Sequence, residues 1–296
     1  MKRRLDIIGA GKAGRTLARL WAQAGVFEIG CIVNRSIGSS QAAVDFIGEG
    51  SPAERVSAIG PLDVLMISTP DKCIEECARS VAREGKAFPD AVVFHCSGSL
   101  SSDNLLVLQQ IGCHIGSVHP IKSFAEPALA VSTFDGTFCA MEGDKPVIDC
   151  LQDAVARIGG HSFEINKASK VIYHAGSVFA SNYLTAMIYA GVRCMEKSNI
   201  PYTQAMEVLQ QIVTGTVENI FKLGPVSALT GPISRGEREV VQKQLNALAQ
   251  WQPEISDAYR AAGVLAVDMA HAQNGASNSD LEDIKQILRR ASKPAE

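Results

Sequence analysis

The sequence lacks the features that mark several classes of protein. Among its 296 residues no run of Lys and Arg is longer than Lys2-Arg3-Arg4, and a net charge of -3 provides no basic surface for DNA or RNA. No stretch approaches the ~18 consecutive apolar residues of a membrane span. No apolar leader precedes the first strand-like segment. We therefore expect a cytoplasmic protein that binds neither nucleic acid nor membranes.

Paired cysteine motifs are also missing. None of the eight cysteines belongs to a Cys-x-x-Cys motif, and Cys31, Cys96 and Cys139 fall in segments predicted to be core strands. Cys73 and Cys77 lie one helical turn apart, but no histidine is near them in the sequence. We therefore expect no metal site and interpret the cysteines as small buried hydrophobic residues.

The chain does contain enough apolar residues, 46%, for the cores of two ordinary domains. Strand-like and helix-like segments alternate up to residue 166, and residues 62–69 form a nearly continuous apolar run, typical of a parallel strand buried on both faces. This alternation predicts an α/β domain over residues 1–166, with a doubly wound sheet. The strand patterns then stop, which predicts an all-α domain over residues 167–296.

The second domain is predicted to begin with a long helix. Residues 167–197 favour helix for about 30 positions without a proline, which corresponds to roughly 45 Å. Further helices are predicted over residues 203–222, 237–250, 253–272 and 279–291. A long helix with apolar faces often packs against its copy, so we expect a homodimer formed through this domain.

Near the N-terminus a short apolar segment runs directly into Gly9-x-Gly11-x-x-Gly14, and a helix-like segment follows. Gly9 permits a tight turn, Gly11 lets the backbone approach a pyrophosphate, and Gly14 lets the helix pack closely on the strand. The N–H groups at the helix start, around Lys12 and Ala13, would then bind phosphates. This spacing predicts a dinucleotide cofactor; the alternative is a glycine turn without a ligand.

The end of the second predicted strand indicates which cofactor is bound. Chains that bind NAD usually have Asp or Glu about 20 residues beyond the glycines. This chain has Asn34, Arg35 and Ser36 there. An acidic side chain would repel a 2′-phosphate, whereas a guanidinium and a hydroxyl can bind it. The sequence therefore favours NADP over NAD, unless Arg35 is only a solvated loop charge.

Polar residues follow three more predicted strands of the same sheet. Ligands of open α/β sheets collect beyond the carboxyl ends of the strands, where Asp71, Ser97 and His119 are expected. Thr69 and Pro70 are expected to bracket the nicotinamide and its ribose. Ser97 is expected to bind a substrate oxygen or the carboxamide, although it could instead stabilise the turn before the next glycine.

The long helix has polar side chains at helical spacing. At 100° per residue, Lys170, His174, Ser177, Ser181 and Thr185 fall within an arc of ~80° on an otherwise apolar helix. Such a stripe indicates contact with a ligand or with water. The alternative is an ordinary solvated face.

A turn within residues 224–236 contains a candidate substrate anchor. The guanidinium of Arg235 can bind a carboxylate through two parallel hydrogen bonds, as a small 2-oxo acid would require. It could act in its own subunit or in the partner subunit of a dimer. A salt bridge between helices is the alternative role for this side chain.

Together these features resemble the superfamily of 6-phosphogluconate dehydrogenase, hydroxyisobutyrate dehydrogenase, ketopantoate reductase and pyrroline-5-carboxylate reductase. Within it, the chain is most similar to Rossmann-like proteins whose C-terminal domain has no known function. The closer match lies in Val64-Leu-Met-Ile-Ser-Thr-Pro-Asp71, His95-Cys-Ser-Gly98, His119-Pro-Ile-Lys-Ser-Phe124, Tyr173-His174 with Ser181-Asn-Tyr-Leu184, and Leu229-Thr-Gly-Pro-Ile-Ser-Arg-Gly236. The resemblance spans nearly the whole chain and implies a Rossmann domain followed by a 6-phosphogluconate-dehydrogenase-like helical domain.

The resemblance also implies roles for residues of the long helix. Dehydrogenases of the superfamily often carry Lys-x-x-x-Asn near its start, where the lysine exchanges the carbonyl proton and the asparagine orients the substrate. Lys170 matches, but His174 occupies the second position. A histidine side chain can deliver a proton near neutral pH, so His174 could share or replace the role of the lysine, or it could be a buried structural residue. Asn182 is the nearest downstream amide.

Ser181 and Lys122 complete the predicted substrate site. From the sequence we expect an NADP-dependent oxidoreductase that reduces a small 2-oxo acid, with ketopantoate as the first candidate. Hydride would pass to the sp² carbon while His174 or Lys170 protonates the oxygen. The alternatives are a reductase of cyclic imines and a non-catalytic NADP-binding redox sensor.

Overall fold

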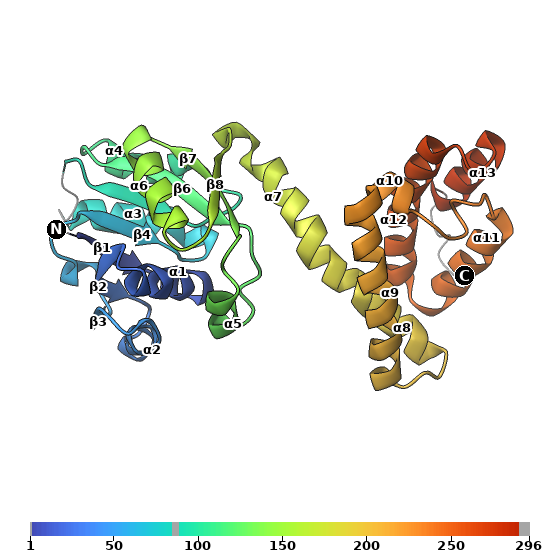
Figure 1. Ribbon diagram of the computed structural model, residues 1–296, viewed down its shortest axis with the longest axis horizontal. Coiled ribbons are helices and arrows are strands. Elements are labelled where there is room, and N and C mark those ends of the chain that lie inside the picture. The colour runs from blue at the N-terminus through green and yellow to red at the C-terminus, as the bar shows by residue number, and fades with distance from the viewer. Residues whose placement is uncertain (1, 85–88, 290–296) are drawn as a thin grey trace. The chain divides into compact units, whose positions relative to one another are not determined.

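The computed structural model describes residues 2–84 and 89–289. These residues fold into two compact units (Figure 1). The first unit ends at Tyr183 and the second begins at Leu184. This division lies beyond the boundary at residue 166 that the sequence predicted. The difference arises because the start of the helical region packs on the sheet: Lys170 is only 1% exposed.

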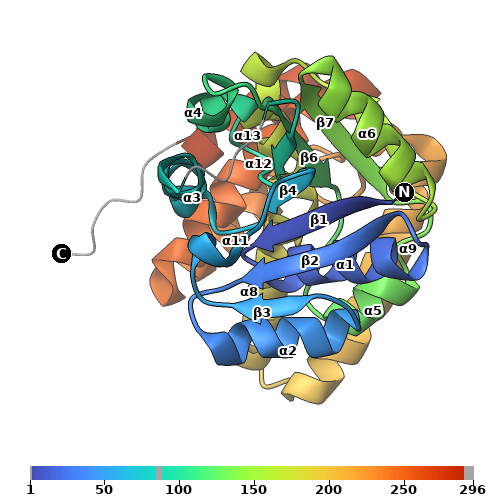
Figure 2. The same cartoon turned by 90° about the vertical axis from the view of Figure 1, so that its left-hand side faces the viewer.

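The described part of the first unit contains an eight-stranded sheet with helices on both faces (Figure 2). Its strand order is β3-β2-β1-β4-β5-β6-β7-β8, which begins with the Rossmann order and confirms the predicted fold class. Strand β7 runs antiparallel to β6, and all other neighbours are parallel. The strands are β1 Arg3–Ile8, β2 Phe27–Val33, β3 Ser51–Ala53, β4 Val64–Ile67, β5 Val92–His95, β6 His114–Pro120, β7 Phe138–Gly143 and β8 His161–Glu164.

Two hydrophobic clusters fix the helices to the sheet. One cluster joins the sheet to α1, α2 and α6, and the other joins it to α3 and α4. Trp21 of α1 is fully buried in the first cluster, and its indole N–H donates to the Ala154 carbonyl of α6 at 2.9 Å. The helices of this unit up to the last strand are α1 Lys12–Gln23, α2 Ile37–Ile47, α3 Asp71–Arg83, α4 Leu106–Gln109, α5 Pro127–Ser132 and α6 Lys145–Ala156.

One strand and one α-helix of this unit had no counterpart in the sequence prediction. Strand β3 has three residues, includes Pro52 and lies at the edge of the sheet, so it shows neither alternation nor an apolar run. Helix α5 has six residues and begins at a proline, Pro127. Both are too short to produce a periodic pattern.

The predicted long helix is continuous, but it contains a π turn. Helix α7 Lys170–Val178, the π turn Phe179–Tyr183 and helix α8 Leu184–Lys197 follow one another directly. The residues of the predicted polar stripe lie in different environments, because Lys170 is buried whereas Ser181 and Thr185 are exposed, and the role of the stripe toward a ligand stays a prediction. The wider π turn also breaks the rotation of 100° per residue on which the stripe was based.

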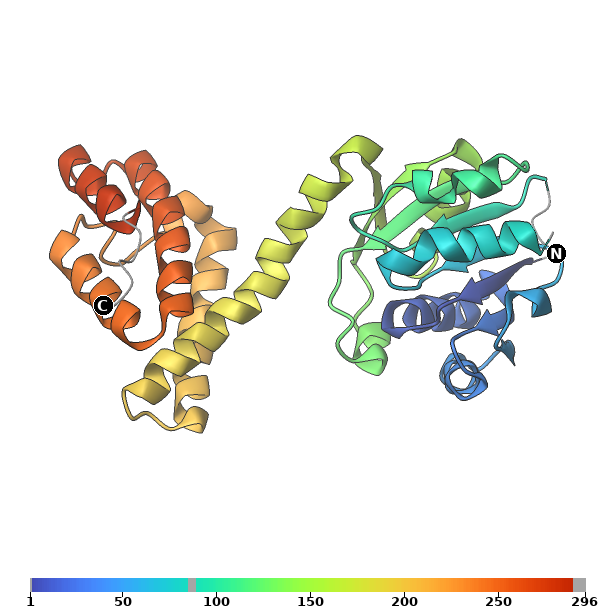
Figure 3. The same cartoon turned by 180° about the vertical axis from the view of Figure 1, so that it is seen from behind.

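The second unit continues with helices, as predicted. They are α9 Tyr202–Leu223, α10 Pro225–Ala228, α11 Arg238–Trp251, α12 Pro253–Gln273 and α13 Asn278–Arg289. Val241, Val267 and Leu281 belong to a core that joins the last three, which lie side by side at the orange and red end of the chain in Figure 3. The prediction that the last helix reaches residue 291 concerns two positions outside the described residues.

Across the described ranges, no helix combines the length and apolar character needed to span a membrane. The same residues contain no group of three or more His, Cys, Asp or Glu side chains placed to hold a metal ion.

Candidate active site

The glycine-rich loop joins β1 to α1. Gly9 has a φ of +85°, which favours glycine, and a Cβ there would lie 2.8 Å from the backbone nitrogen of Thr69. A Cβ at Gly14 would lie 2.9 Å from the Ser68 hydroxyl, so α1 packs tightly against the end of β4. A Cβ at Gly11 would meet nothing within 4 Å. The loop is therefore tight where it packs and open at Gly11, a shape that fits a pyrophosphate.

A cavity of about 680 Å³ opens beside this loop, a size ordinary for ligand sites. Of the predicted cofactor residues, Gly9, Gly11, Asn34, Arg35, Thr69 and Pro70 line it. The remaining walls come from β1, β2 and α3 and include Cys73 and Cys77. The structure thus brings one end of the glycine loop and the end of β2 to a single cavity.

Asn34 and Ser36 have partners within the protein. The side-chain carbonyl of Asn34 accepts the Ala10 N–H at 2.8 Å, and its side-chain NH₂ donates to the Ser39 carbonyl at 2.9 Å. Ser36 caps α2, where its hydroxyl accepts the Ser39 N–H. Arg35 is exposed, and within residues 2–84 and 89–289 it forms no ion pair. Arg35 is therefore the member of this group available to a phosphate.

Three other predicted site residues also form hydrogen bonds with other residues of the chain. The Lys12 ammonium donates to the Ala125 carbonyl at 2.7 Å, and the Lys122 ammonium donates to the Thr133 carbonyl at 2.6 Å. The carboxylate of Asp71 accepts the Ser99 hydroxyl at 2.8 Å. Contacts of this kind order the loops beyond the strand ends, and their roles toward ligands stay predictions.

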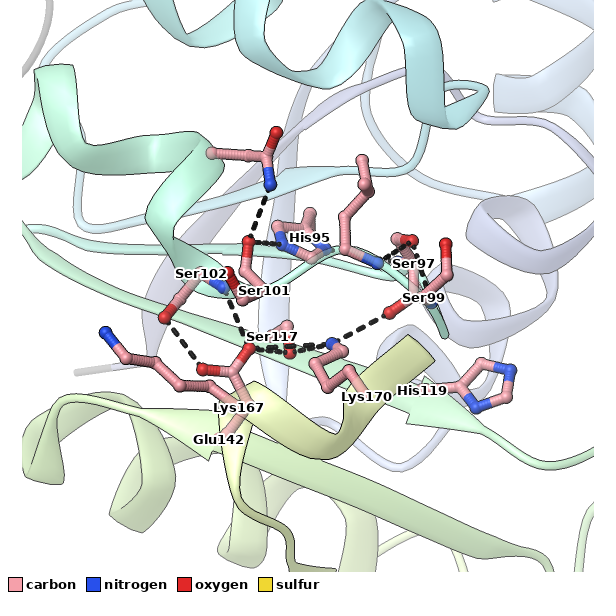
Figure 4. Close-up of polar contacts among 12 residues, drawn as sticks. His95, Ser97, Ser99, Ser101, Ser102, Ser117, His119, Glu142, Lys167 and Lys170 are labelled. Carbon is pink, nitrogen blue, oxygen red and sulfur yellow. Dashed lines mark hydrogen bonds and ion pairs between the residues drawn. The ribbon is translucent and has the colours of Figure 1, made fainter. Parts of the chain in front are cut away.

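A buried polar network joins the end of β5 to Ser117 of β6, Glu142 of β7 and the start of α7 (Figure 4). The Lys170 ammonium donates to the Ser97 carbonyl at 3.0 Å and to the Ser117 hydroxyl at 2.5 Å, and it lies 3.5 Å from the Glu142 carboxylate. Burial lowers the pKa of Lys170, and the charge of Glu142 opposes that shift. These three oxygens match the three N–H groups of the ammonium, so Lys170 anchors α7 to the sheet.

Glu142 is the counter-ion of this network and was missed from the sequence. It is 5% exposed and accepts the Ser102 N–H at 2.9 Å, the Ser102 hydroxyl at 2.7 Å and the Ser117 hydroxyl at 2.6 Å. A single acidic residue at the end of an apolar strand usually lies at the surface. Its only sequence signal was the apolar segment that it follows.

Ser97 stabilises a turn, which is the alternative role that the sequence left open. Its hydroxyl oxygen accepts the N–H groups of Ser99 and Leu100 at 3.2 and 3.0 Å, and its contact with substrate stays a prediction. The Ser97 N–H donates to Nδ1 of His95 at 3.2 Å, and Nε2 of His95 lies 3.0 Å from the Ser101 carbonyl. Burial lowers the pKa of His95 to about 4, so the ring is neutral and carries its proton on Nε2.

His119, Tyr173 and His174 form a second cluster at the end of β6. The Tyr173 hydroxyl lies 2.9 Å from Nδ1 of His119, and the rings of His119 and His174 meet edge to face at 5.2 Å. Burial lowers the pKa of His119 to about 4, and the neighbouring His174 contributes a smaller part of this shift. Nδ1 of His174 is buried and has no hydrogen-bond partner in the described part of the chain. This cluster therefore offers one neutral imidazole and one ring nitrogen available for a new hydrogen bond.

Gly98 lies against both histidines. A Cβ at this position would collide with Nδ1 of His174 and come within 2.8 Å of Nε2 of His119. The missing side chain therefore lets the two rings pack directly against the Gly98 backbone, beyond the end of β5, on the side of the sheet where ligands bind.

The other predicted substrate residues lie in exposed segments. Asn182 and Ser181 belong to the π turn and are exposed. Arg235 belongs to the second unit and forms a bidentate ion pair with Glu237, at 2.7 and 3.0 Å. This pair uses Nε and Nη2 of the guanidinium, whose remaining N–H groups could still donate to a substrate carboxylate.

Comparison with known proteins extends over both parts of the chain. Residues 1–120 match a Rossmann-like domain, and residues 137–265 match a domain of unknown function, DUF2520. No curated protein gives a significant match. Among solved structures, protein TM1727 from Thermotoga maritima is similar, with 26% identity and a TM-score of 0.69 over 91% of this chain and 99% of that one.

Two other similar structures share the fold at lower identity. Pyrroline carboxylate reductase from Plasmodium falciparum, with NADP bound, is 14% identical, with a TM-score of 0.57 over 97% of this chain and 98% of that one. An imine reductase from Myxococcus stipitatus in complex with NADP+ is also 14% identical, with a TM-score of 0.62 over 97% and 100%. The two domain matches identify the chain as a protein that joins a Rossmann-like domain to a DUF2520 domain.

Proposed function

We propose that this protein is an NADP-dependent oxidoreductase that reduces a small 2-oxo acid, with ketopantoate as the first candidate. The observation that carries this proposal is the cavity of about 680 Å³ that joins Gly9 and Gly11 to Arg35. The open loop at Gly11 suits a pyrophosphate, and the guanidinium suits a 2′-phosphate. The NADP-bound reductases that share the fold support the same choice of cofactor.

NADPH, when bound, would supply a hydride to the carbonyl carbon of the substrate. The carbonyl oxygen then takes up one proton, which a residue of the chain must deliver. His174 is better suited to this role than Lys170, because its Nδ1 has no partner in the described residues whereas the Lys170 ammonium is fully bonded. Lys170 acts by holding the Ser97 backbone and the start of α7.

We retain the predicted candidates for binding the substrate carboxylate or carbonyl, which are Ser97, His119, Lys122, Ser181, Asn182 and Arg235. A homodimer is also part of the proposal. Its support is the exposed apolar surface of α9, where Ile212 is 63% and Phe221 is 87% exposed. Sedimentation of the purified protein measures the oligomeric state directly.

Reduction of a cyclic imine is the second candidate. It is favoured by the fold shared with pyrroline carboxylate reductase and imine reductase. The same hydride chemistry applies, with the imine nitrogen in place of the carbonyl oxygen as the atom that takes up the proton.

The test is oxidation of NADPH, followed by absorbance, with the purified protein and a panel of 2-oxo acids and cyclic imines. NADH is run in parallel. Turnover of ketopantoate but not of imines supports the first candidate, and the reverse supports the second. Tight NADPH binding without any turnover would favour the redox sensor, and failure to bind NADPH would contradict all three.

Replacing Arg35 with glutamine is expected to raise the KM for NADPH by about tenfold to 100-fold, since a hydrogen bond to a charged group contributes ~1.5–3 kcal/mol. The KM for NADH should change less than about twofold, because NADH has no 2′-phosphate. Arg79→Gln is the matched control: this exposed arginine of α3 pairs with Glu75 and does not line the cavity. An equal increase in the KM for NADPH and in the KM for NADH would show that Arg35 does not contact the 2′-phosphate.

A further inference from the structure

We propose that Tyr173 is a positioning residue that sets the tautomer of His119, so that the Nε2–H of His119 is the hydrogen-bond donor to the substrate oxygen. This inference rests on the proposed function, because it gives His119 a role in polarising the carbonyl or imine acid that is reduced. Sequence reasoning assigned His119 to substrate but gave Tyr173 no role.

A chain of side chains leads to His119. The Tyr173 hydroxyl lies 2.9 Å from Nδ1 of His119, and the side chain of Ser177, one turn further along α7, hydrogen-bonds to Tyr173. Burial raises the pKa of Tyr173 to about 12, so the phenol keeps its proton. With the Ser177 hydroxyl donating to the phenol oxygen, the phenol proton is directed to Nδ1 of His119.

The acceptor role of Nδ1 determines where His119 carries its own proton. A neutral imidazole has one N–H group, and the other nitrogen accepts. The pKa of His119, lowered by burial to about 4, keeps the ring neutral at physiological pH. Because Nδ1 accepts from Tyr173, the ring proton lies on Nε2.

Nε2 lies close to the Gly98 backbone, beyond the end of β5. A Cβ at Gly98 would come within 2.8 Å of Nε2 of His119 and would collide with Nδ1 of His174. Ligands of such sheets bind beyond these strand ends, so we place the substrate carbonyl oxygen where it accepts from Nε2–H. A neutral imidazole in such a place polarises a carbonyl by hydrogen bonding and leaves delivery of the proton to another group.

The test is a double-mutant cycle between Tyr173→Phe and His119→Gln. Tyr173→Phe is expected to lower kcat at least about tenfold, with the KM for NADPH changed less than about twofold. The glutamine amide can supply an N–H in place of Nε2–H and has no tautomer to set. In the His119→Gln background Tyr173→Phe should therefore change kcat less than about twofold. Tyr189→Phe, an exposed tyrosine of α8, is the control.

The tautomer is measured without any turnover by the ¹⁵N NMR shifts of the histidine rings, with His119 assigned from the His119→Gln spectrum. We expect a protonated Nε2 and an unprotonated Nδ1 in the wild type, and a mixture of tautomers in Tyr173→Phe. A protonated Nδ1 in the wild type, or an equal loss of kcat in both backgrounds, overturns the inference. The expected spectra in a protein that reduces nothing would refute the proposed function and leave the tautomer assignment standing.

Discussion

Replacing Glu142 with glutamine is expected to lower the free energy of unfolding by about 3 to 5 kcal/mol, the range for removing one partner of a buried ion pair. The Lys170 ammonium is 1% exposed and would stay buried without its counter-ion. The amide would also replace a carboxylate that accepts three hydrogen bonds from Ser102 and Ser117, and its NH₂ group cannot accept. Urea unfolding measures the loss.

Two variants separate the charge effect from a general loss of packing. The double replacement of Glu142 with glutamine and Lys170 with methionine should restore much of the stability, because no unpaired charge stays buried. Asp103→Asn removes an ion pair between two half-exposed side chains, Asp103 and Lys167, and should change stability far less than Glu142→Gln does, because solvent screens such a pair. A loss in Glu142→Gln no larger than the loss in Asp103→Asn would contradict the buried-pair interpretation.

Acid is expected to destabilise the fold through His95. Burial lowers its pKa from 6.5 to about 4, so the folded protein favours the neutral ring. The contribution of the neutral His95 ring to the free energy of unfolding is complete above pH 6.5, where neither the folded nor the unfolded protein binds the proton. It is lost as the pH falls from 6.5 to about 4, because the unfolded chain then binds a proton that the folded protein excludes. The free energy of unfolding that is lost over this pH range is about 3 kcal/mol.

The structural reason is that His95 uses both ring nitrogens. Nδ1 accepts the Ser97 N–H, and Nε2 faces the Ser101 carbonyl, so a second proton would break the first bond and add a charge near Lys170. Urea unfolding at several pH values measures the slope. His95→Gln should be less stable at pH 7 but lose less stability on acidification, whereas the exposed His161→Gln should keep the wild-type slope. Identical slopes in wild type and His95→Gln would refute the assignment.

The parts of the fold that the sequence predicted are those with strong local signals. The glycine spacing at Gly9, Gly11 and Gly14 follows directly from backbone geometry, and the continuous apolar run of residues 62–69 marks a strand buried on both faces. Such features depend on neighbours close in the sequence. Strand β3 and helix α5 were missed because three and six residues are too few for a period to appear.

The buried network could not be predicted, because its partners are far apart in the sequence. Lys170 was found through its family position, but the polar-stripe pattern indicated contact with a ligand or with water rather than with the sheet. Its actual contacts with Ser97, Ser117 and Glu142 exist only after four segments have come together. A helical wheel treats a helix as isolated and regular, and the π turn at residues 179–183 violates the second assumption.

The hydrogen bond from the Ala10 N–H to Asn34 makes the glycine loop and the start of α2 a single preorganised unit. The loop need not be ordered by the ligand, so little of the binding free energy is spent on its conformational entropy. Amide exchange at Ala10 should therefore already be slow in the ligand-free protein. Substitutions at Asn34 are expected to weaken affinity by loosening the loop rather than by removing a contact to the ligand.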